Sequence, residues 1–383
     1  MSEITPFRVT IDDQAVADLR DRLARTRWPD REPVDDWSQG LPLAYARELC
    51  HHWRDGYDFA AAEARLNRFP QYRTELAGGD DDPIAIHFLH VPSPHDGALP
   101  LVLTHGWPGS VVEFSHVIDA LVDPPAHGGD PADAFHVVCP SLPGYGFSDA
   151  PTAPGWDVER IARAWAELMA RLGYGRYGAQ GGDWGSFVTT SIAQQDAAHL
   201  AGIHIQLPIA PLTPELLTEL TPAEEASLAA SAHYARWDSG YSSQQSTRPQ
   251  TLGYGLADSP AFQCAWIVEK FWSWTDNDGH PEQALARDDL LDNVMLYWLP
   301  NHGASSARLY WESFHDQNMA PVTVPAGCSI FPSEIVRFSR RWVEHRFTDI
   351  RFWGQPEHGG HFAAFEQPEI FVDQVRTFFR EVR

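Results

Sequence analysis

The chain has 383 residues, 43% of them hydrophobic, and a formal net charge of −24. It is long enough to bury a large core and too acidic to favour nucleic acid as a partner. The polar N-terminus does not resemble a secretory signal, and no apolar run of about 18 residues predicts a membrane span. The four cysteines are dispersed without a CxxC pair, so neither a zinc site nor a disulfide framework is expected. A soluble, cytoplasmic protein is therefore predicted.

Residues 1–90 are predicted to form a helical arm with polar turns. Helical spacing of apolar residues covers residues 15–27 and ends at Trp28-Pro29, and a second amphipathic stretch covers residues 43–53. Residues 78–83 (GGDDDP) have the composition of a solvated loop, and we favour this interpretation over a calcium site.

A different pattern begins after residue 90. Short apolar runs alternate with helical stretches, and the runs cover residues 99–104 (LPLVLT), 135–140 (FHVVCP), 177–180 and 203–207. This alternation predicts βαβ units and a mostly parallel central sheet flanked by helices.

A helical cap is predicted to interrupt this α/β core. Residues 211–320 carry no strand signal and are rich in aromatic residues, and the strand pattern returns at residues 327–331 and 350–353. The insertion therefore follows the sixth core strand, as lids over active sites do. The predicted domains are the arm (1–90), the first part of the core (91–210), the cap (211–320) and the second part of the core (321–383).

Residues 173–178 (GYGRYG) match the GxGxxG pattern of dinucleotide-binding sites. That motif must follow a strand and open a helix, whereas here it follows the helix predicted over residues 158–172 and precedes a strand. We interpret it as a glycine-rich helix end, and no cofactor is expected.

The candidate nucleophile is Asp183, at the centre of residues 181–185 (GGDWG). A nucleophile on a sharp strand-to-helix turn needs small residues two positions before and after it, because the turn crowds the backbone. Gly181 and Gly185 meet this requirement, with Asp at the position that Ser occupies in other such turns. The pattern predicts an α/β-hydrolase fold with Asp183 at the carboxyl edge of the sheet, beneath the cap.

An aspartate nucleophile restricts the chemistry. A carboxylate displaces a leaving group from a saturated carbon and remains as an alkyl ester, so the substrate must be an epoxide or a halide. Water must then attack the ester carbonyl, which requires a histidine base, an acid that orients it and an oxyanion hole. An epoxide also yields an alkoxide, which a phenol with a pKa of about 10 is suited to protonate.

His361 is the predicted base, because it follows the last predicted strand and precedes a helix-like stretch. Glu334 follows the penultimate strand and is the predicted acid, with Asp349 as the alternative. His358 lies three residues before His361 and could suggest a metal pair, but no third ligand is evident, so no metal is expected.

The predicted oxyanion hole consists of two backbone N–H groups, from Trp184 directly after the nucleophile and from Trp107 in the turn at residues 105–108. Candidate proton donors are the cap tyrosines, among which spacing alone does not distinguish: Tyr234, Tyr241, Tyr254, Tyr297 and Tyr310. The single lysine, Lys270, is interpreted as composition bias rather than as a functional residue.

Several segments resemble the microsomal-type epoxide hydrolases and their soluble bacterial relatives, nearly from end to end. The segments are residues 22–29 (RLARTRWP), 63–70 (EARLNRFP), 104–110 (THGWPGS) with Glu113-Phe114, 140–149 (PSLPGYGFSD) and 359–366 (GGHFAAFE). The resemblance implies Asp183 as nucleophile, His361 as base and Glu334 as acid. It also implies two acidic tyrosines: Tyr241, before residues 245–249 (QSTRP), and Tyr310, within residues 307–311 (ARLYW).

Two other functions stay open. A haloalkane dehalogenase would share residues 183–185 (DWG), although the tyrosines, the arm and Trp107 favour an epoxide. A ligand-binding protein on the same fold is the second alternative, although Asp183, Glu334 and His361 are all present.

The expected partners are an epoxide and water, without nucleic acid or membrane. Membrane-bound members of the family carry an N-terminal anchor, whereas this sequence begins with the arm. The aromatic cap indicates a bulky apolar or aromatic epoxide, such as an intermediate of secondary metabolism, and the residues expected to contact it are Trp107, Trp184, Tyr241 and Tyr310. A homodimer and the choice between detoxification and biosynthesis stay open.

Overall fold

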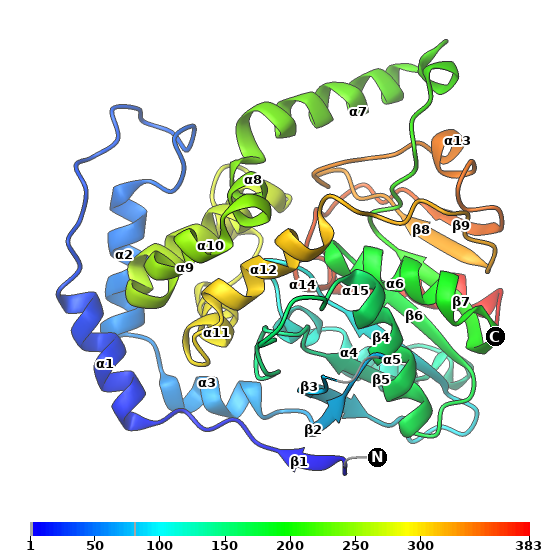
Figure 1. Ribbon diagram of the computed structural model, residues 1–383, viewed down its shortest axis with the longest axis horizontal. Helices are drawn as coiled ribbons and strands as arrows, with labels where there is room; N and C mark the ends of the chain where they lie inside the picture. The colour runs from blue at the N-terminus through cyan, green and yellow to red at the C-terminus, as the bar shows by residue number, and fades with distance from the viewer. Residues whose placement is uncertain (1–2, 80–81) are drawn as a thin grey trace.

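The computed structural model describes residues 3–79 and 82–383, and within them the chain forms a sheet of nine strands (Figure 1). The strands are β1 (Thr5–Phe7), β2 (Gln71–Leu76), β3 (Ile84–Val91), β4 (Leu99–Thr104), β5 (Phe135–Pro140), β6 (Tyr177–Gly181), β7 (Leu200–Ile205), β8 (Ala326–Ser329) and β9 (Ile350–Gly354). Their order is β1-β2-β3-β5-β4-β6-β7-β8-β9. The pairs from β5 to β9 are parallel and those from β1 to β5 are antiparallel. The mostly parallel sheet is as predicted.

Helices pack on the parallel strands, and several core connections are short 3-10 turns. The core helices are α4 (Ile118–Val122), α5 (Val158–Arg171), α6 (Trp184–Gln195), α13 (Arg340–Val343), α14 (Ala363–Glu366) and α15 (Pro368–Arg380), and the turns are η1 (Val111–Phe114), η2 (Pro124–His127), η3 (Pro131–Asp133) and η4 (Ala197–His199). Every residue of β6 and β7 is buried, as expected for strands that are covered on both faces. The glycine-rich residues 173–178 lie between α5 and β6, as the sequence predicted.

Helix α15 approaches the sheet closely because glycines lie beneath it. A Cβ atom added at Gly178 would come within 2.3 Å of the Phe379 ring, and one added at Gly327 within 2.6 Å of the Phe378 ring. These two phenylalanines are fully buried, so the last helix of the chain is fixed to the sheet by tight aromatic packing.

The prediction of a purely helical segment over residues 1–90 is wrong. The predicted helices are present as α1 (Asp13–Ala24) and α2 (Leu43–Asp55), followed by α3 (Phe59–Leu66), but β1, β2 and β3 join the main sheet. Strand β2 lacks an apolar run because its buried residues include Gln71 and Thr74. Gln71 instead pairs with His87 of β3, at 2.8 Å between Oε1 and Nε2. Of the predicted loop at residues 78–83, Asp80 and Asp81 lie outside the described residues.

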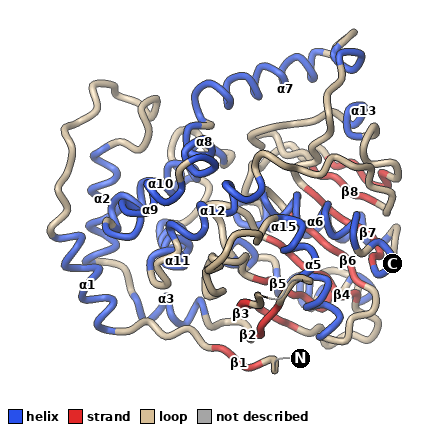
Figure 2. The backbone as a smooth tube through the Cα atoms, in the orientation of Figure 1, coloured by secondary structure: helices blue, strands red, loops and turns tan. Residues whose placement is uncertain are grey.

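The segment between β7 and β8 is helical and forms the cap (Figures 1 and 2). Its elements are η5 (Pro214–Leu217), α7 (Pro222–His233), the π-helix η6 (Tyr234–Asp238), α8 (Gly240–Thr247), α9 (Pro249–Asp258), α10 (Pro260–Trp274), η7 (Pro281–Gln283), α11 (Arg287–Trp298) and α12 (Gly303–Ser313). The cap follows β7, which is the seventh strand along the chain and the sixth if the short β1 is left out. The exact domain boundaries stay a prediction. In the described ranges, no helix combines the length and apolar character that crossing a membrane requires.

The arm packs against the cap as well as the core. Helices α1 and α2 contact α10 (Figure 1), and the indole ring of Trp37 stacks on that of Trp272 with 4.8 Å between centroids. The buried carboxylate of Asp292 on α11 accepts hydrogen bonds from Arg65 Nε at 2.6 Å and from the Tyr57 hydroxyl. The arm therefore connects cap and core along one side of the molecule.

Arg346 holds both stems of the cap. Its guanidinium donates to Ile209 O at 2.7 Å on the entry stem, and to Asn318 O at 2.5 Å and Ala320 O at 3.4 Å on the exit stem. The residue is 5% exposed, and burial lowers the pKa of its guanidinium to about 10, which still leaves it charged at neutral pH.

We predict that Arg346→Leu lowers the free energy of unfolding by about 2–4 kcal/mol, because carbonyl groups on both stems lose a charged donor. Urea unfolding measures this loss. The matched control is Arg351→Leu, since Arg351 is 54% exposed and pairs with Asp349 at the surface, and its change should stay within about 0.5 kcal/mol. Equal losses of stability in the two variants would contradict the inference that Arg346 holds both stems of the cap.

Candidate active site

Asp183 lies on the turn between β6 and α6 with a strained backbone. Its φ is 48° and its ψ is −129°, a conformation that non-glycine residues rarely adopt. A Cβ atom at Gly181 would lie 2.1 Å from Gly185 O, and one at Gly185 would lie 1.9 Å from Thr104 O. Only glycine fits at these two positions, which is the physical basis of the GGDWG spacing.

The structure brings the three predicted polar residues together at the end of the sheet. Asp183 Oδ2 lies 3.3 Å from His361 Nε2, and His361 Nδ1 lies 2.6 Å from Glu334 Oε1. Glu334 and His361 are 4% and 3% exposed. Within the described residues, His361 Nε2 makes no hydrogen bond of good geometry, so its close approach to Asp183 is a charge contact.

The charge state of His361 depends on both carboxylates. Burial by itself lowers the pKa of the imidazole, but the charge of Glu334, its hydrogen bond to Nδ1 and the charge contact with Asp183 outweigh it and raise the pKa well above its ordinary value. The two carboxylates therefore favour the protonated form of His361 in the free protein.

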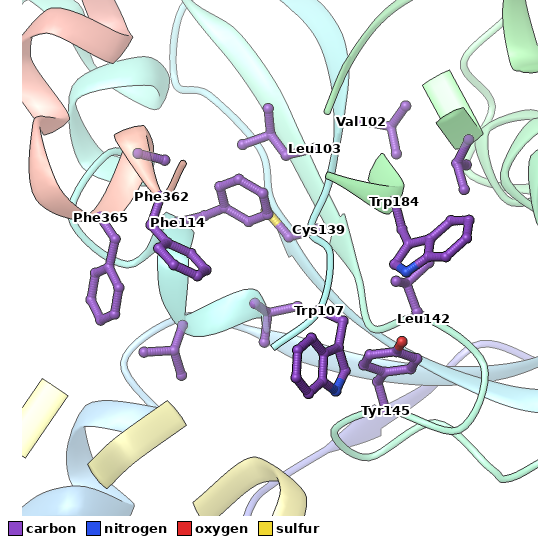
Figure 3. Packing of buried hydrophobic residues seen from close by; sticks show 14 of the residues in the cluster. Val102, Leu103, Trp107, Phe114, Cys139, Leu142, Tyr145, Trp184, Phe362 and Phe365 are labelled. Carbon is purple, nitrogen blue, oxygen red and sulfur yellow. The ribbon is translucent and has the colours of Figure 1, made fainter. Parts of the chain in front are cut away.

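The Asp183 carboxylate is also held by the turn after β4. Trp107 N–H donates to Asp183 Oδ1 at 2.7 Å, and a Cβ atom at Gly106 would come within 2.2 Å of that oxygen. Trp184 is the first residue of α6, where backbone donors have no acceptor within the helix. Figure 3 shows the side chains of Trp107 and Trp184 in the core cluster, with Tyr145 and Leu142 beside them.

Four aromatic rings pack against one another close to Asp183. The Trp107 ring stacks on Tyr241 with 4.9 Å between centroids and 8° between planes, and it meets Tyr310 edge to face at 5.9 Å. Tyr310 also meets Trp184 edge to face at 4.8 Å. All four predicted contact residues thus form one aromatic wall.

The five cap tyrosines have different surroundings. Tyr254 is 71% exposed, and the Tyr297 hydroxyl donates to Gly109 O at 2.6 Å, so neither is available to a substrate beside Asp183. The Tyr310 hydroxyl is buried without a partner among the described residues. The Tyr241 hydroxyl lies 2.9 Å from that of Tyr234.

Two residues beside Tyr241 were not predicted from the sequence. Lys270, interpreted there as composition bias, is buried with its ammonium 4.9 Å from the Tyr241 ring centroid and 2.6 Å from Asp238 Oδ1. Trp274 packs on the rings of Tyr241 and His361 at about 5 Å, with centroid distances of 5.1 and 5.0 Å. The only signal in the sequence was that Lys270 stands alone in a chain rich in arginine.

The cap is hydrogen-bonded directly to the loop that carries His361. The His361 N–H donates to Trp274 O at 2.8 Å, the Gly359 N–H donates to Asp276 Oδ2 at 2.9 Å, and the Asp276 N–H donates to Glu366 Oε2 at 2.8 Å. Burial raises the pKa of Glu366 to about 7. The position of the histidine is therefore set by the cap as well as by the core.

Glu113 is a further buried carboxyl group near the site, and the sequence did not predict a role for it. It is 8% exposed, and its Oε1 atom has no hydrogen-bond partner in the described part of the chain. Burial, opposed by the charge of His361 and reinforced by that of Asp183, raises its pKa to about 8. It is therefore largely a neutral acid at pH 7.

The alternative residues lie elsewhere. Asp349 pairs with Arg351 at the surface. His358 is 71% exposed and lies 3.7 Å from Asp276. Within residues 3–79 and 82–383, no group of three His, Cys, Asp or Glu side chains is arranged to hold a metal ion.

Comparisons with known proteins show the family of the chain. Residues 4–114 match the family model "Epoxide hydrolase N terminus", and residues 100–261 match the α/β-hydrolase fold model. A putative epoxide hydrolase of Stigmatella aurantiaca is 53% identical over 99% of this chain and 86% of that protein. Epoxide hydrolase 1 of Sus scrofa is 35% identical over 98% of this chain and 88% of that protein.

A solved structure extends the similarity to the whole fold. The epoxide hydrolase of Aspergillus niger superposes with a TM-score of 0.89 at 31% identity, over 100% of this chain and 97% of that one. The α/β-hydrolase fold predicted from the sequence is confirmed, and so is the resemblance on which the family was inferred. The chain belongs to the microsomal-type epoxide hydrolases and is an enzyme that hydrolyses an epoxide.

Proposed function

We propose that the enzyme converts its epoxide to a vicinal diol in two half-reactions through an ester on Asp183. The observation that carries the proposal is the arrangement of the Asp183 carboxylate, whose Oδ1 accepts the Trp107 N–H at 2.7 Å and whose Oδ2 lies 3.3 Å from His361 Nε2. Oδ2 attacks one epoxide carbon and displaces the ring oxygen. Oδ1 then becomes the ester carbonyl oxygen, already bound to one donor of the oxyanion hole, with the Trp184 N–H as the second.

The change in charge on Asp183 prepares the second half-reaction. In the free enzyme, Asp183 and Glu334 both favour the imidazolium form of His361. Once Asp183 is a neutral ester, one of the two carboxylates no longer acts on the imidazole, so the pKa of His361 falls, the imidazolium releases its proton to solvent and the neutral base forms. His361 then takes a proton from water that attacks the ester carbonyl, while Glu334 orients the ring through the 2.6 Å contact with Nδ1.

Tyr241 and Tyr310 are proposed as the donors to the epoxide oxygen. Both phenols are buried in the aromatic wall, 5% and 2% exposed, with 5.8 Å between their ring centroids. A neutral phenol both polarises the epoxide C–O bond and protonates the alkoxide formed as that bond breaks. The uncharged rings of the wall favour a bulky apolar or aromatic epoxide.

Asp183→Asn should abolish diol formation in a folded protein, because a neutral amide does not displace the epoxide oxygen. Diol formation from styrene oxide, measured immediately after purification, tests this, and slow recovery through deamidation is expected on storage. Asp349→Asn is the matched control and should keep wild-type turnover. Full initial activity in Asp183→Asn would remove Asp183 as nucleophile.

His361→Gln should separate the half-reactions, because alkylation needs only Asp183 and the tyrosines. We expect intact-protein mass spectrometry to detect the enzyme plus the mass of one substrate, with peptide mapping to Asp183. The control His358→Gln should turn over without accumulating an adduct. Substrate consumption by His361→Gln without an adduct would place the base elsewhere.

Tyr241→Phe and Tyr310→Phe should each slow alkylation roughly tenfold to a thousandfold, within the range of general-acid contributions. Hydrolysis of the preformed ester should change little, since the alkoxide exists only in the first step. Rapid-mixing measurements of single turnovers separate the two rates, with Tyr254→Phe as control. Because both phenols act on one oxygen, the two losses should not add.

The same variants separate the epoxide reaction from a dehalogenase. A halide leaves without a proton, so its release would be insensitive to removing either hydroxyl. Wild-type rates of both variants on every epoxide tested would make these tyrosines packing residues only.

A further inference from the structure

We propose that Tyr234 is a positioning residue for the first half-reaction. Its hydroxyl donates a hydrogen bond to the Tyr241 oxygen, which directs the Tyr241 proton toward the epoxide and stabilises the phenolate that remains after proton transfer. The proposal rests on the proposed role of Tyr241 as proton donor.

The hydroxyl contact defines the geometry. The oxygens of Tyr234 and Tyr241 are 2.9 Å apart. A phenol has one proton to give and lone pairs that accept, so if Tyr241 gave its proton to Tyr234 it would have none for the substrate. If Tyr234 is the donor, Tyr241 keeps its proton for the substrate, and accepting a bond makes its own O–H a stronger donor.

The backbone at Tyr234 is unusual in a way that fits this role. Tyr234 is the first residue of the π-helix η6, which lies between α7 and α8. π-helical turns are rare and are found frequently at functional sites. Here the turn joins Tyr234 to the helix that carries Tyr241, and the hydroxyls of both side chains meet.

Tyr241 needs such support because its surroundings disfavour a phenolate. Burial, with the nearby charge of Asp183, raises the pKa of Tyr241 well above its ordinary value. The Lys270 ammonium lies 4.9 Å from the ring centroid, but its charge is shared with Asp238 and Glu269, at 2.6 and 2.8 Å. The Tyr234 hydroxyl is the uncharged donor that acts on the oxygen itself.

Tyr234 also connects Tyr241 to solvent. It lines an open cleft of about 530 Å³ with His233, Asp238, Trp274 and Glu334, and Tyr241 does not line this cleft. When Tyr241 transfers its proton to the alkoxide, the Tyr234 proton moves to the Tyr241 oxygen and a proton from water in the cleft restores Tyr234. Before the second half-reaction the His361 imidazolium releases one proton to solvent, which offsets the proton taken up by Tyr234. The attacking water then gives one proton back to His361 and its other proton to the diol oxygen released from the ester, and its oxygen stays on the Asp183 carboxylate, so the complete turnover is balanced.

Tyr234→Phe tests the proposal without changing ring packing. The rate constant for alkylation by styrene oxide at saturation should fall about five- to thirtyfold, as for loss of one hydrogen bond to a developing charge. The apparent substrate dissociation constant and the rate of ester hydrolysis should stay within about twofold, since only proton transfer to the alkoxide is affected. A purely structural role would alter binding or both half-reactions. The control Tyr254→Phe should alkylate at the wild-type rate.

A double-mutant cycle shows whether Tyr234 affects alkylation through the Tyr241 hydroxyl. In the Tyr241→Phe background, adding Tyr234→Phe should slow alkylation by less than about twofold, whereas in the Tyr310→Phe background the loss should persist. Wild-type alkylation by Tyr234→Phe, or an equal loss with and without the Tyr241 hydroxyl, would overturn the inference.

If Tyr241→Phe slows alkylation and Tyr234→Phe does not, only this inference fails. If Tyr241→Phe has no effect, both it and the proposed donor fail.

Discussion

The backbone crossing at Asp183 is the constraint on which the rest of the site depends. Strand β6, helix α6 and the end of β4 meet there so closely that no side chain fits at Gly181 or Gly185. The close approach holds the turn after β4 against the carboxylate, where the Trp107 N–H reaches it at 2.7 Å. The strained backbone of Asp183 costs of the order of 1–3 kcal/mol. It places the carboxylate so that its two oxygens face different partners.

Residues tied to the ends of strands could be predicted from the sequence. Asp183, Glu334 and His361 each follow a strand, and the parallel sheet brings strand ends to one edge, so their order along the chain implied the observed contacts. Tyr241 and Tyr310 lie on cap helices, where spacing does not reveal which face meets the core. They were identified only through resemblance to a family. The geometry that brings Tyr234 to Tyr241 depends on a π-helical turn with no sequence signature.

The fold was predicted less well where polar residues are buried. Strand β2 was missed because Gln71 and Thr74 occupy its interior positions, and hydrophobic periodicity is the signal on which strand prediction relies. The position of Lys270 could not be predicted for a similar reason. A single lysine has no pattern around it, and its contact with Tyr241 depends on the tertiary arrangement of α10 and α8, which local sequence does not encode.

The cap is fastened on three sides: at its stems by Arg346, along its flank by the arm, and at its base by the loop of His361. Opening this cap as a rigid body would break its hydrogen bonds to the loop of His361 and move the histidine away from Asp183. Rearrangement of side chains is the entry route that would keep these hydrogen bonds, and with them the assembled site. Along such a route, the rate of passage and not only the final fit would discriminate against a large epoxide.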